Sequence, residues 1–308
     1  MTMLRRFASL AVHSLLAVAC TAVGTQSGPA ADPRRVVDEL LAADRQFSAA
    51  AARTDAISAI SPMLADDVWM PIGGRFARER AAVKEALRGL FGAPDIRAEW
   101  TPIRGGISAD GGQGFTFGYM TVVKWDGSRT PLKYLSYWVK QPAGWRVVAY
   151  KLTRRATGNM PVALMEPALP AHSVAPSSDR ATMAAHLESL IAAERAFSDR
   201  AQQIGLGLAF EENGSADAVN MGGPDSPSFI VGSRAIGRAV SGGATGPPSP
   251  VSWAADRAIV ASSGDLGVTF GMIRPNTPPP DTARPASIPF FTIWRRTRPT
   301  DPWRYIAE

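Results

Sequence analysis

The hydrophobic pattern of this chain changes from a helical period to a strand period. Apolar residues recur every three to four positions over 37–47 and again over 183–197, which predicts two amphipathic helices. After the first of them, at 115–120, large apolar side chains alternate with Thr, Gly and Met, which is typical of a strand. Helices followed by a meander of antiparallel strands predict an α+β fold.

The pattern occurs twice. The letters FTFG at 115–118 return as VTFG at 268–271, and the same interval separates Trp100 from Trp253. Upstream, LLAADRQFS at 40–48 returns as LIAAERAFS at 190–198. A repeat of this length predicts one domain written twice. We therefore expect repeat 1 at 36–155, a Pro-rich linker at 156–179 and a degenerate repeat 2 at 180–308.

Local signals set out the expected elements of repeat 1. Asp32 followed by Pro33 predicts a helix start, because Asp can cap and Pro is tolerated in the first turn. A second helical stretch should reach Leu64, and the pair Asp66-Asp67 should turn into a short strand. A helix at 80–90 and strands at 132–140 and 145–152 follow. Repeat 2 has the same order, interrupted by Gly/Pro-rich stretches at 213–227 and 242–250 and a proline-laden insertion at 275–289.

The N-terminus is expected to be a signal peptide, 1–19. Arg5-Arg6 provides its positive end, and the apolar run 7–19 is too short to span a bilayer. LAVAC at 16–20 resembles a bacterial lipobox, in which Cys20, the chain's single cysteine, would be acylated. The alternative is soluble release after the Ala-Val-Ala. Residues 20–35 would then form a tether, and we expect a periplasmic protein held to a membrane by this lipid alone.

Composition and charge exclude several classes of function. The net charge is +6, from 33 basic and 27 acidic residues, but the basic side chains are scattered, which argues against nucleic-acid binding. The three histidines, His13, His172 and His186, lie outside repeat 1. Repeat 1 therefore has no Ser-His-Asp set, and with the cysteine in the leader thiol catalysis is excluded. We expect neither a metal nor a cofactor.

Carboxylates are the remaining catalytic candidates. Asp44 and Glu194 each stand inside the apolar stripe of their helix, which suits a buried acid with a raised pKa. The alternative for each is a salt bridge with Arg146 or Arg304, or partial exposure at the edge of the stripe. Asp67, next to Asp66, is either an acid at a pocket mouth or part of a turn.

Four motifs of repeat 1 carry a family resemblance: LAADRQF at 41–47, LADD at 64–67, FGY at 117–119 and GWRVV at 144–148. With them the chain resembles the nuclear-transport-factor-2-like superfamily, and more narrowly the exported SnoaL-like domains. The resemblance implies two cones, each a curved antiparallel sheet wrapped by helices around a pocket. That superfamily includes ketosteroid isomerase, polyketide cyclases and epoxide hydrolases.

The resemblance also allows a residue-by-residue test. Ketosteroid isomerase places a phenol, a carboxylate base and a protonated acid where repeat 1 has Phe47, Met70 and Ser136. The equivalents in repeat 2 are Phe197, Met221 and Thr292. Phe and Met cannot exchange a proton, so we expect no ketosteroid isomerisation. The ligand-binding set expected for the repeat 1 pocket is Phe47, Met70, Trp100, Tyr119, Tyr134 and Ser136.

The resulting expectation is an exported, lipid-anchored tandem-cone protein that binds a small apolar molecule or serves as a scaffold. The alternative is a SnoaL-like cyclase, isomerase or hydrolase using Asp44 or Asp67 with Tyr119 in the repeat 1 pocket. Repeat 2 is the poorer candidate for a site because of its Gly/Pro-rich interruptions. As family members commonly pair through the open face of the sheet, the two repeats should form an intramolecular pseudo-dimer.

Overall fold

The computed structural model describes residues 31–92, 96–158, 160–243, 246–277 and 285–308. The signal peptide expected at 1–19, Cys20 and most of the tether lie outside these ranges. The middle of the proline-laden insertion at 275–289 also lies outside them.

The first half of the chain forms a six-stranded sheet in the order β2-β1-β6-β5-β4-β3. Its helices come first, as the hydrophobic period predicts. The elements are α1 (Pro33–Ala51), α2 (Ala56–Ile60), the 3-10 turn η1 (Ser61–Met63), β1 (Leu64–Ile72), β2 (Arg75–Arg78), α3 (Glu79–Phe91), β3 (Arg97–Ile107), β4 (Gln113–Val123), β5 (Arg129–Gln141) and β6 (Gly144–Arg154).

The second half repeats this plan in a sheet of order β8-β7-β12-β11-β10-β9. Its elements are α4 (Arg180–Ile204), α5 (Leu206–Asn213), β7 (Gly214–Asn220), β8 (Ile230–Val231), α6 (Ser233–Val240), β9 (Val251–Val260), β10 (Leu266–Pro275), β11 (Ile288–Arg295) and β12 (Arg304–Ala307). The matching orders confirm the α+β architecture in two tandem copies.

Two local expectations need correction. Neither sheet is wholly antiparallel, because β1 pairs with β6 in parallel and β7 pairs with β12 in parallel. Asp66 and Asp67 do not form a turn before a strand; both are exposed residues inside β1, which already begins at Leu64. The expected helix start is confirmed, since the Asp32 side chain accepts a hydrogen bond from the backbone N–H of Arg34 at 3.1 Å.

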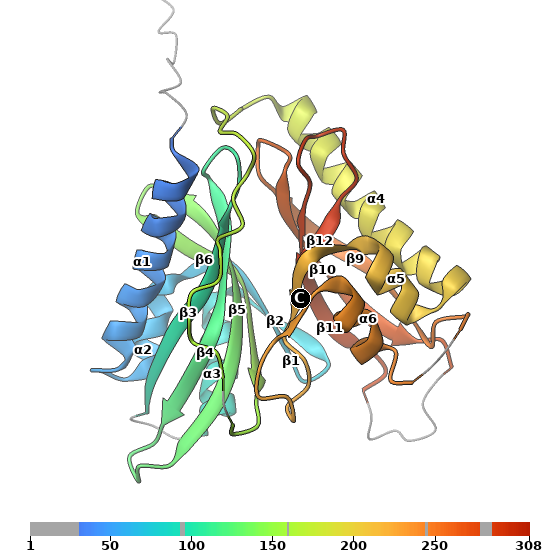
Figure 1. Ribbon diagram of the computed structural model, residues 1–308. Helices are drawn as coiled ribbons and strands as arrows, with labels where there is room; N and C mark the ends of the chain where they lie inside the picture. Colours follow the sequence, from blue (N-terminus) through green and yellow to red (C-terminus); the bar gives the residue numbers. More distant parts are fainter. Residues whose placement is uncertain (1–30, 93–95, 159, 244–245, 278–284) are drawn as a thin grey trace, which may run out of the picture.

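The Pro-rich segment between the halves follows the edge of the first sheet. The N–H of Met165 donates to the carbonyl of Ile103 at 2.7 Å, and that of Ala168 donates to the carbonyl of Gly105 at 2.9 Å. The segment thus provides partners for part of the outer edge of β3, where free backbone groups would otherwise face solvent. In Figure 1 it runs along β3 before rising to α4.

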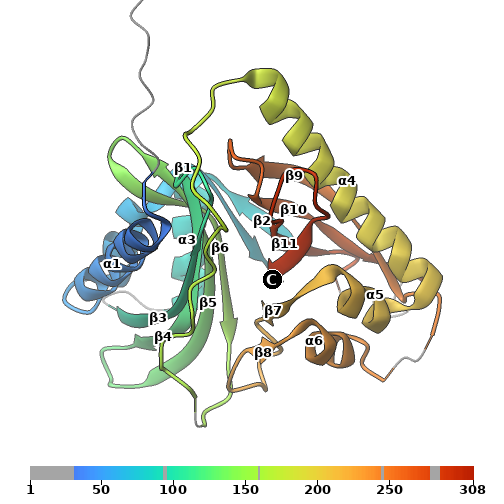
Figure 2. The ribbon, with the colours of Figure 1, turned by 45° about the horizontal axis from the view of Figure 1, so that its top comes forward.

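The two sheets face each other at the centre of the molecule, with α1 and α4 on the outer sides (Figures 1 and 2). One buried cluster contains residues of both halves, among them Phe117 and Phe229, whose ring centroids are 4.8 Å apart. Phe270 of repeat 2 is equivalent to Phe117, and Phe76 of repeat 1 is equivalent to Phe229. Their ring centroids are 6.3 Å apart, so the same contact occurs twice across the interface. Two further clusters fill the space between each sheet and its own helices.

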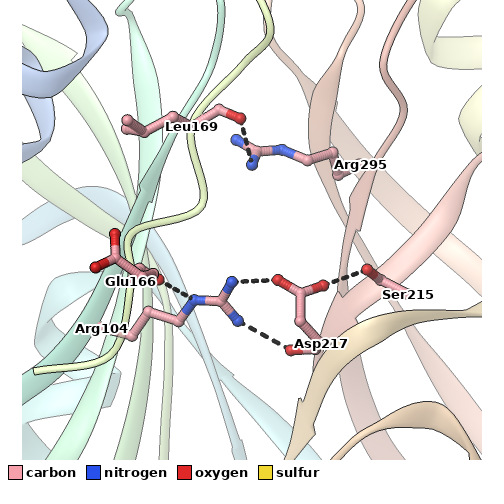
Figure 3. Close-up of polar contacts among 6 residues, drawn as sticks. All are labelled: Arg104, Glu166, Leu169, Ser215, Asp217 and Arg295. Carbon is pink, nitrogen blue, oxygen red and sulfur yellow. Dashed lines mark hydrogen bonds and ion pairs between the residues drawn. The ribbon is translucent and has the colours of Figure 1, made fainter.

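Two ion pairs between the halves also consist of equivalent residues that contact each other in both directions. Arg104 of β3 pairs with Asp217 of β7, and its Nε donates to the carbonyl of Glu166 at 2.9 Å (Figure 3). Arg257 of β9 pairs with Asp67 of β1 at 2.6 Å. Arg104 lies opposite Phe117 in its sheet just as Arg257 lies opposite Phe270, so these arginines occupy equivalent positions.

Candidate functional site

Asp44 is fully buried in repeat 1 and is hydrogen-bonded by two aromatic side chains. Trp100 Nε1 donates to its Oδ1 at 2.6 Å, and the Tyr134 hydroxyl donates to its Oδ2 at 2.8 Å. Burial raises the pKa of the Asp44 carboxyl, and these hydrogen bonds partly offset that rise. The salt bridge considered for Asp44 is not formed, because Arg146 instead donates to the carbonyl of Trp145 at 2.7 Å.

Glu194 is buried in a similar environment in repeat 2, with a second indole and a threonine hydroxyl where repeat 1 has a tyrosine hydroxyl. Trp253 Nε1 donates to its Oε1 at 2.7 Å and Trp294 Nε1 to its Oε2 at 3.0 Å, while the Thr269 hydroxyl also donates to Oε2. Burial raises the pKa of this carboxyl too. Each acid thus links its helix to the neighbouring strand by accepting a hydrogen bond from a tryptophan indole. The duplication of the arrangement points to a structural role for both acids.

Most of the ligand-binding residues expected in repeat 1 are part of a closed core. Met70, Trp100 and Tyr134 are almost fully buried in the cluster between the sheet and its helices. Phe47 is half-buried and stacks on Trp138 at a centroid distance of 6.3 Å. Ser136 is buried, and its hydroxyl has no hydrogen-bond partner. These side chains occupy the space that the resemblance assigns to a pocket.

Repeat 1 also has a cavity of about 240 Å³ at its rim. Its walls include Phe91, Val122, Leu132 and Arg154. None of the six expected ligand-binding residues lines it, so the residue pattern did not predict it.

The structure does not bring together the acids and the phenol of the alternative enzyme hypothesis. Tyr119 lies on the opposite face of β4 from the repeat 1 core and packs against Phe229 of repeat 2 at 5.4 Å. Asp67 is exposed and paired with Arg257. Asp44 is in the core. Tyr119 is therefore an interface residue, because strand alternation turns it away from the helices.

Repeat 2, expected to be the poorer candidate, contains an apolar cavity of about 220 Å³. It lies in the cone between the helices α5 and α6 and the strands β9 to β11. The lining residues are mostly aliphatic or aromatic: Leu206, Phe210, Val240, Val251, Trp253, Ile273, Phe290 and Phe291. Four polar side chains complete the wall: Lys151, Asn220, Thr292 and Glu308.

Substitutions between the repeats explain the opening of the second cone at this position. Trp69 and Val219 both lie opposite an alanine of the neighbouring strand, so the residues that follow them, Met70 and Asn220, are equivalent. This register corrects the expectation that Met221 matches Met70. In the neighbouring strands, the buried Tyr150 ring of repeat 1 is replaced by Glu308. Repeat 2 thus has shorter, polar side chains at two positions that repeat 1 fills.

The polar side chains of this cavity have perturbed acid–base properties. Asn220 Nδ2 donates to Glu308 Oε1 at 2.7 Å. Burial raises the pKa of the Glu308 carboxyl to about 7, and desolvation lowers the pKa of the Lys151 ammonium. Sequence reasoning missed Lys151 and Glu308. Alignment of WRVVAY at 145–150 with WRYIAE at 303–308 would have revealed the exchange of Tyr150 for Glu308.

Two further features bear on the class of protein. Among the described helices, none has the length and apolar character needed to cross a membrane. In the part of the chain that the structure describes, no three His, Cys, Asp or Glu side chains gather as a metal site.

No family model and no curated protein match the chain. It is similar to a nuclear-transport-factor-2-like protein with a cystatin-like fold from Novosphingobium aromaticivorans, at 16% identity over 39% of this chain and 81% of that one, with a TM-score of 0.32. It is also similar to a nuclear-transport-factor-2-like protein of unknown function from Shewanella oneidensis, at 9% identity over 37% and 96%, with a TM-score of 0.31. A protein with a cystatin-like fold from Caulobacter vibrioides matches at 16% identity over 39% and 89%, with a TM-score of 0.31.

Each of these matches spans about the length of one repeat. Identities and scores of this size carry no information about function. The chain's own sheet orders show two tandem α+β copies.

Proposed function

We propose that this protein binds a small, mainly apolar molecule in the cone of repeat 2. The observation that carries the proposal is the cavity of about 220 Å³, lined by aliphatic and aromatic side chains with a few polar groups. Such a lining is typical of small-molecule sites. An apolar cavity of about 150 Å³ can hold benzene, so by proportion this one suits a ligand of roughly nine non-hydrogen atoms.

Repeat 1 has a supporting role in this proposal. Its core is closed by Met70, Trp100 and Tyr150, and its buried acid already has two donors. A ligand at the same position would have to displace packed aromatic side chains, which costs several kcal/mol in general.

We further propose that the two repeats act as an intramolecular pseudo-dimer. The reciprocal pairs support it, since the contact of Arg104 with Asp217 is matched by that of Arg257 with Asp67. In a two-fold symmetric interface, each contact occurs twice, once in each direction between equivalent residues.

Export and lipid anchoring at Cys20 remain proposals that rest on the N-terminal sequence. In this view the wild-type protein fractionates with membranes, and Cys20→Ala releases it. Recovery of the wild type entirely in the soluble periplasmic fraction would contradict the lipid anchor.

A thermal-shift screen tests the binding proposal. A panel of apolar molecules of about nine non-hydrogen atoms should include members that raise the apparent Tm, because a ligand that binds the native state stabilises it. Val251→Phe narrows the cavity and should abolish the shift. Val123→Phe alters a half-buried valine of repeat 1 outside the cavity and should preserve it. The proposal fails if no member shifts the wild type, or if Val251→Phe keeps the full shift.

A further inference from the structure

Lys151 belongs to repeat 1 but lines the cavity of repeat 2. It lies in β6, where it is paired with Leu135 of β5. Leu135 is part of the cluster between the two sheets, whereas the neighbouring Tyr150 is part of the repeat 1 core. The Lys151 side chain therefore leaves its own repeat on the interface side and completes the wall of the other repeat's cavity.

Within the part of the chain that the structure describes, the Lys151 ammonium forms no ion pair, and the nearby Glu308 carboxyl opposes the desolvation of this charge only through space. Among the described residues it also makes no hydrogen bond, and Glu308 of the same cavity is not within the 4.0 Å ion-pair distance. A charge beside apolar walls is costly unless an opposite charge compensates it. The desolvation that lowers the pKa of Lys151 is the same effect.

Glu308 can donate a hydrogen bond to an anionic ligand when its carboxyl is protonated. The Asn220 amide donates to one of its oxygens at 2.7 Å and so fixes the orientation of the carboxyl. Its pKa of about 7 means that a large fraction is protonated near neutral pH. A protonated carboxyl offers an O–H donor, whereas a carboxylate would repel an anionic ligand.

We propose that the ligand of this cavity is a small carboxylic acid with an apolar body. Its carboxylate is held by the Lys151 ammonium and by the O–H of Glu308, and its body lies against Trp253, Ile273 and Phe290. Hydrogen bonds between charged partners are the strong ones, so this contact contributes both affinity and selection. A neutral molecule of the same shape would leave the ammonium unpaired. This inference rests on the proposed function and makes the site incomplete without repeat 1.

Isothermal titration of the full chain near pH 6 with cinnamic acid and with cinnamyl alcohol tests the charge preference. The two probes share an apolar body and differ in their polar group. We expect the acid to bind at least about tenfold more tightly, because a hydrogen bond to a charged partner is stronger than one to a neutral group. Lys151→Met should remove this preference and leave alcohol binding within about threefold, whereas Lys151→Arg should keep the preference.

Lys124→Met is the matched control, since Lys124 lines the cavity at the rim of repeat 1 and not the cavity of repeat 2. It should leave both affinities unchanged. Equal binding of acid and alcohol to the wild type, or a preference that survives in Lys151→Met, would overturn the carboxylate inference while the proposed function stands. If neither probe binds and no member of the apolar panel raises the Tm, the proposed function and the carboxylate inference are both contradicted. The comparison of the two probes on the wild type remains decisive even if Lys151→Met does not fold.

Discussion

Arg104 of repeat 1 is almost fully buried and forms an ion pair with Asp217 of repeat 2 (Figure 3). The equivalent pair in the opposite direction, Arg257 with Asp67, lies nearer the surface, with 28% and 61% of the two side chains exposed. The interface thus contains the same contact in two environments. Burial decides how much each contributes, because water screens exposed charges and not buried ones.

This difference predicts unequal effects of two matched substitutions. Asp217→Asn leaves the buried Arg104 guanidinium without its carboxylate and should lower the free energy of unfolding by about 1–3 kcal/mol; half of Asp217 is exposed, so the value should be below that for a fully buried pair. Asp67→Asn should cost about 0–1 kcal/mol. Urea unfolding of both variants measures the difference, and equal losses would show that the pairs are equally screened.

Asp44 should be essential for stability and not for chemistry. Asp44→Ala removes the acceptor of Trp100 Nε1 and of the Tyr134 hydroxyl, so both donors stay buried and unpaired. We expect a loss of about 2–4 kcal/mol in the free energy of unfolding. Asp38→Ala, on the exposed face of the same helix, should stay within about 0.5 kcal/mol. A loss of ligand binding in Asp44→Ala without a loss of stability would contradict the structural role.

Glu308 should make stability depend on pH. Its folded-state pKa of about 7 lies above the ordinary value of 4.5, so the folded protein holds this proton more tightly than the unfolded chain. Its stabilising contribution is complete below pH 4.5 and is lost as the pH rises through about 7. Lys151, Glu194 and Tyr305 are the titrating neighbours coupled to it. The stability of the wild type relative to Glu308→Gln should decline over this window, and a constant difference would refute the raised pKa.

Repeat 1 alone, residues 32–155, should dimerise or aggregate. In the whole chain Phe117 and Tyr119 pack against Phe229 of repeat 2, and without it they would form part of an exposed apolar face. Size-exclusion chromatography with light scattering gives the oligomeric state. A soluble monomer with native-like stability would mean that the two repeats do not depend on each other.

The repeated hydrophobic pattern was sufficient to predict the class and order of elements. Strand pairing was harder, because the residues of β1 do not specify that it lies parallel to β6. The direction of the Asp67 and Tyr119 side chains was also missed. Both face the other repeat, and neither residue carries a local signal of an interface.

The apolar stripes of the two helices were sufficient to predict that Asp44 and Glu194 are buried. They did not predict that these acids have a structural role. Donors from the sheet occupy both carboxyls: the indole of Trp100 lies 56 positions from Asp44 in the sequence, and that of Trp253 lies 59 positions from Glu194. The periodicity of a helix contains no information about such distant partners. The cavity was missed for a related reason. Lys151 reaches it only because the two sheets pack together, and periodicity within one repeat contains no information about that packing.

The most direct test of a ligand site in repeat 2 is methyl NMR of the full chain titrated with a panel member that raises the Tm. We expect chemical-shift changes for the methyl groups of Leu206, Val240, Val251 and Ile273, which line the cavity. The methyl groups of Val37, Leu40 and Leu87, in the closed core of repeat 1, should not move. Shifts confined to the repeat 1 core, or to neither cone, would contradict it.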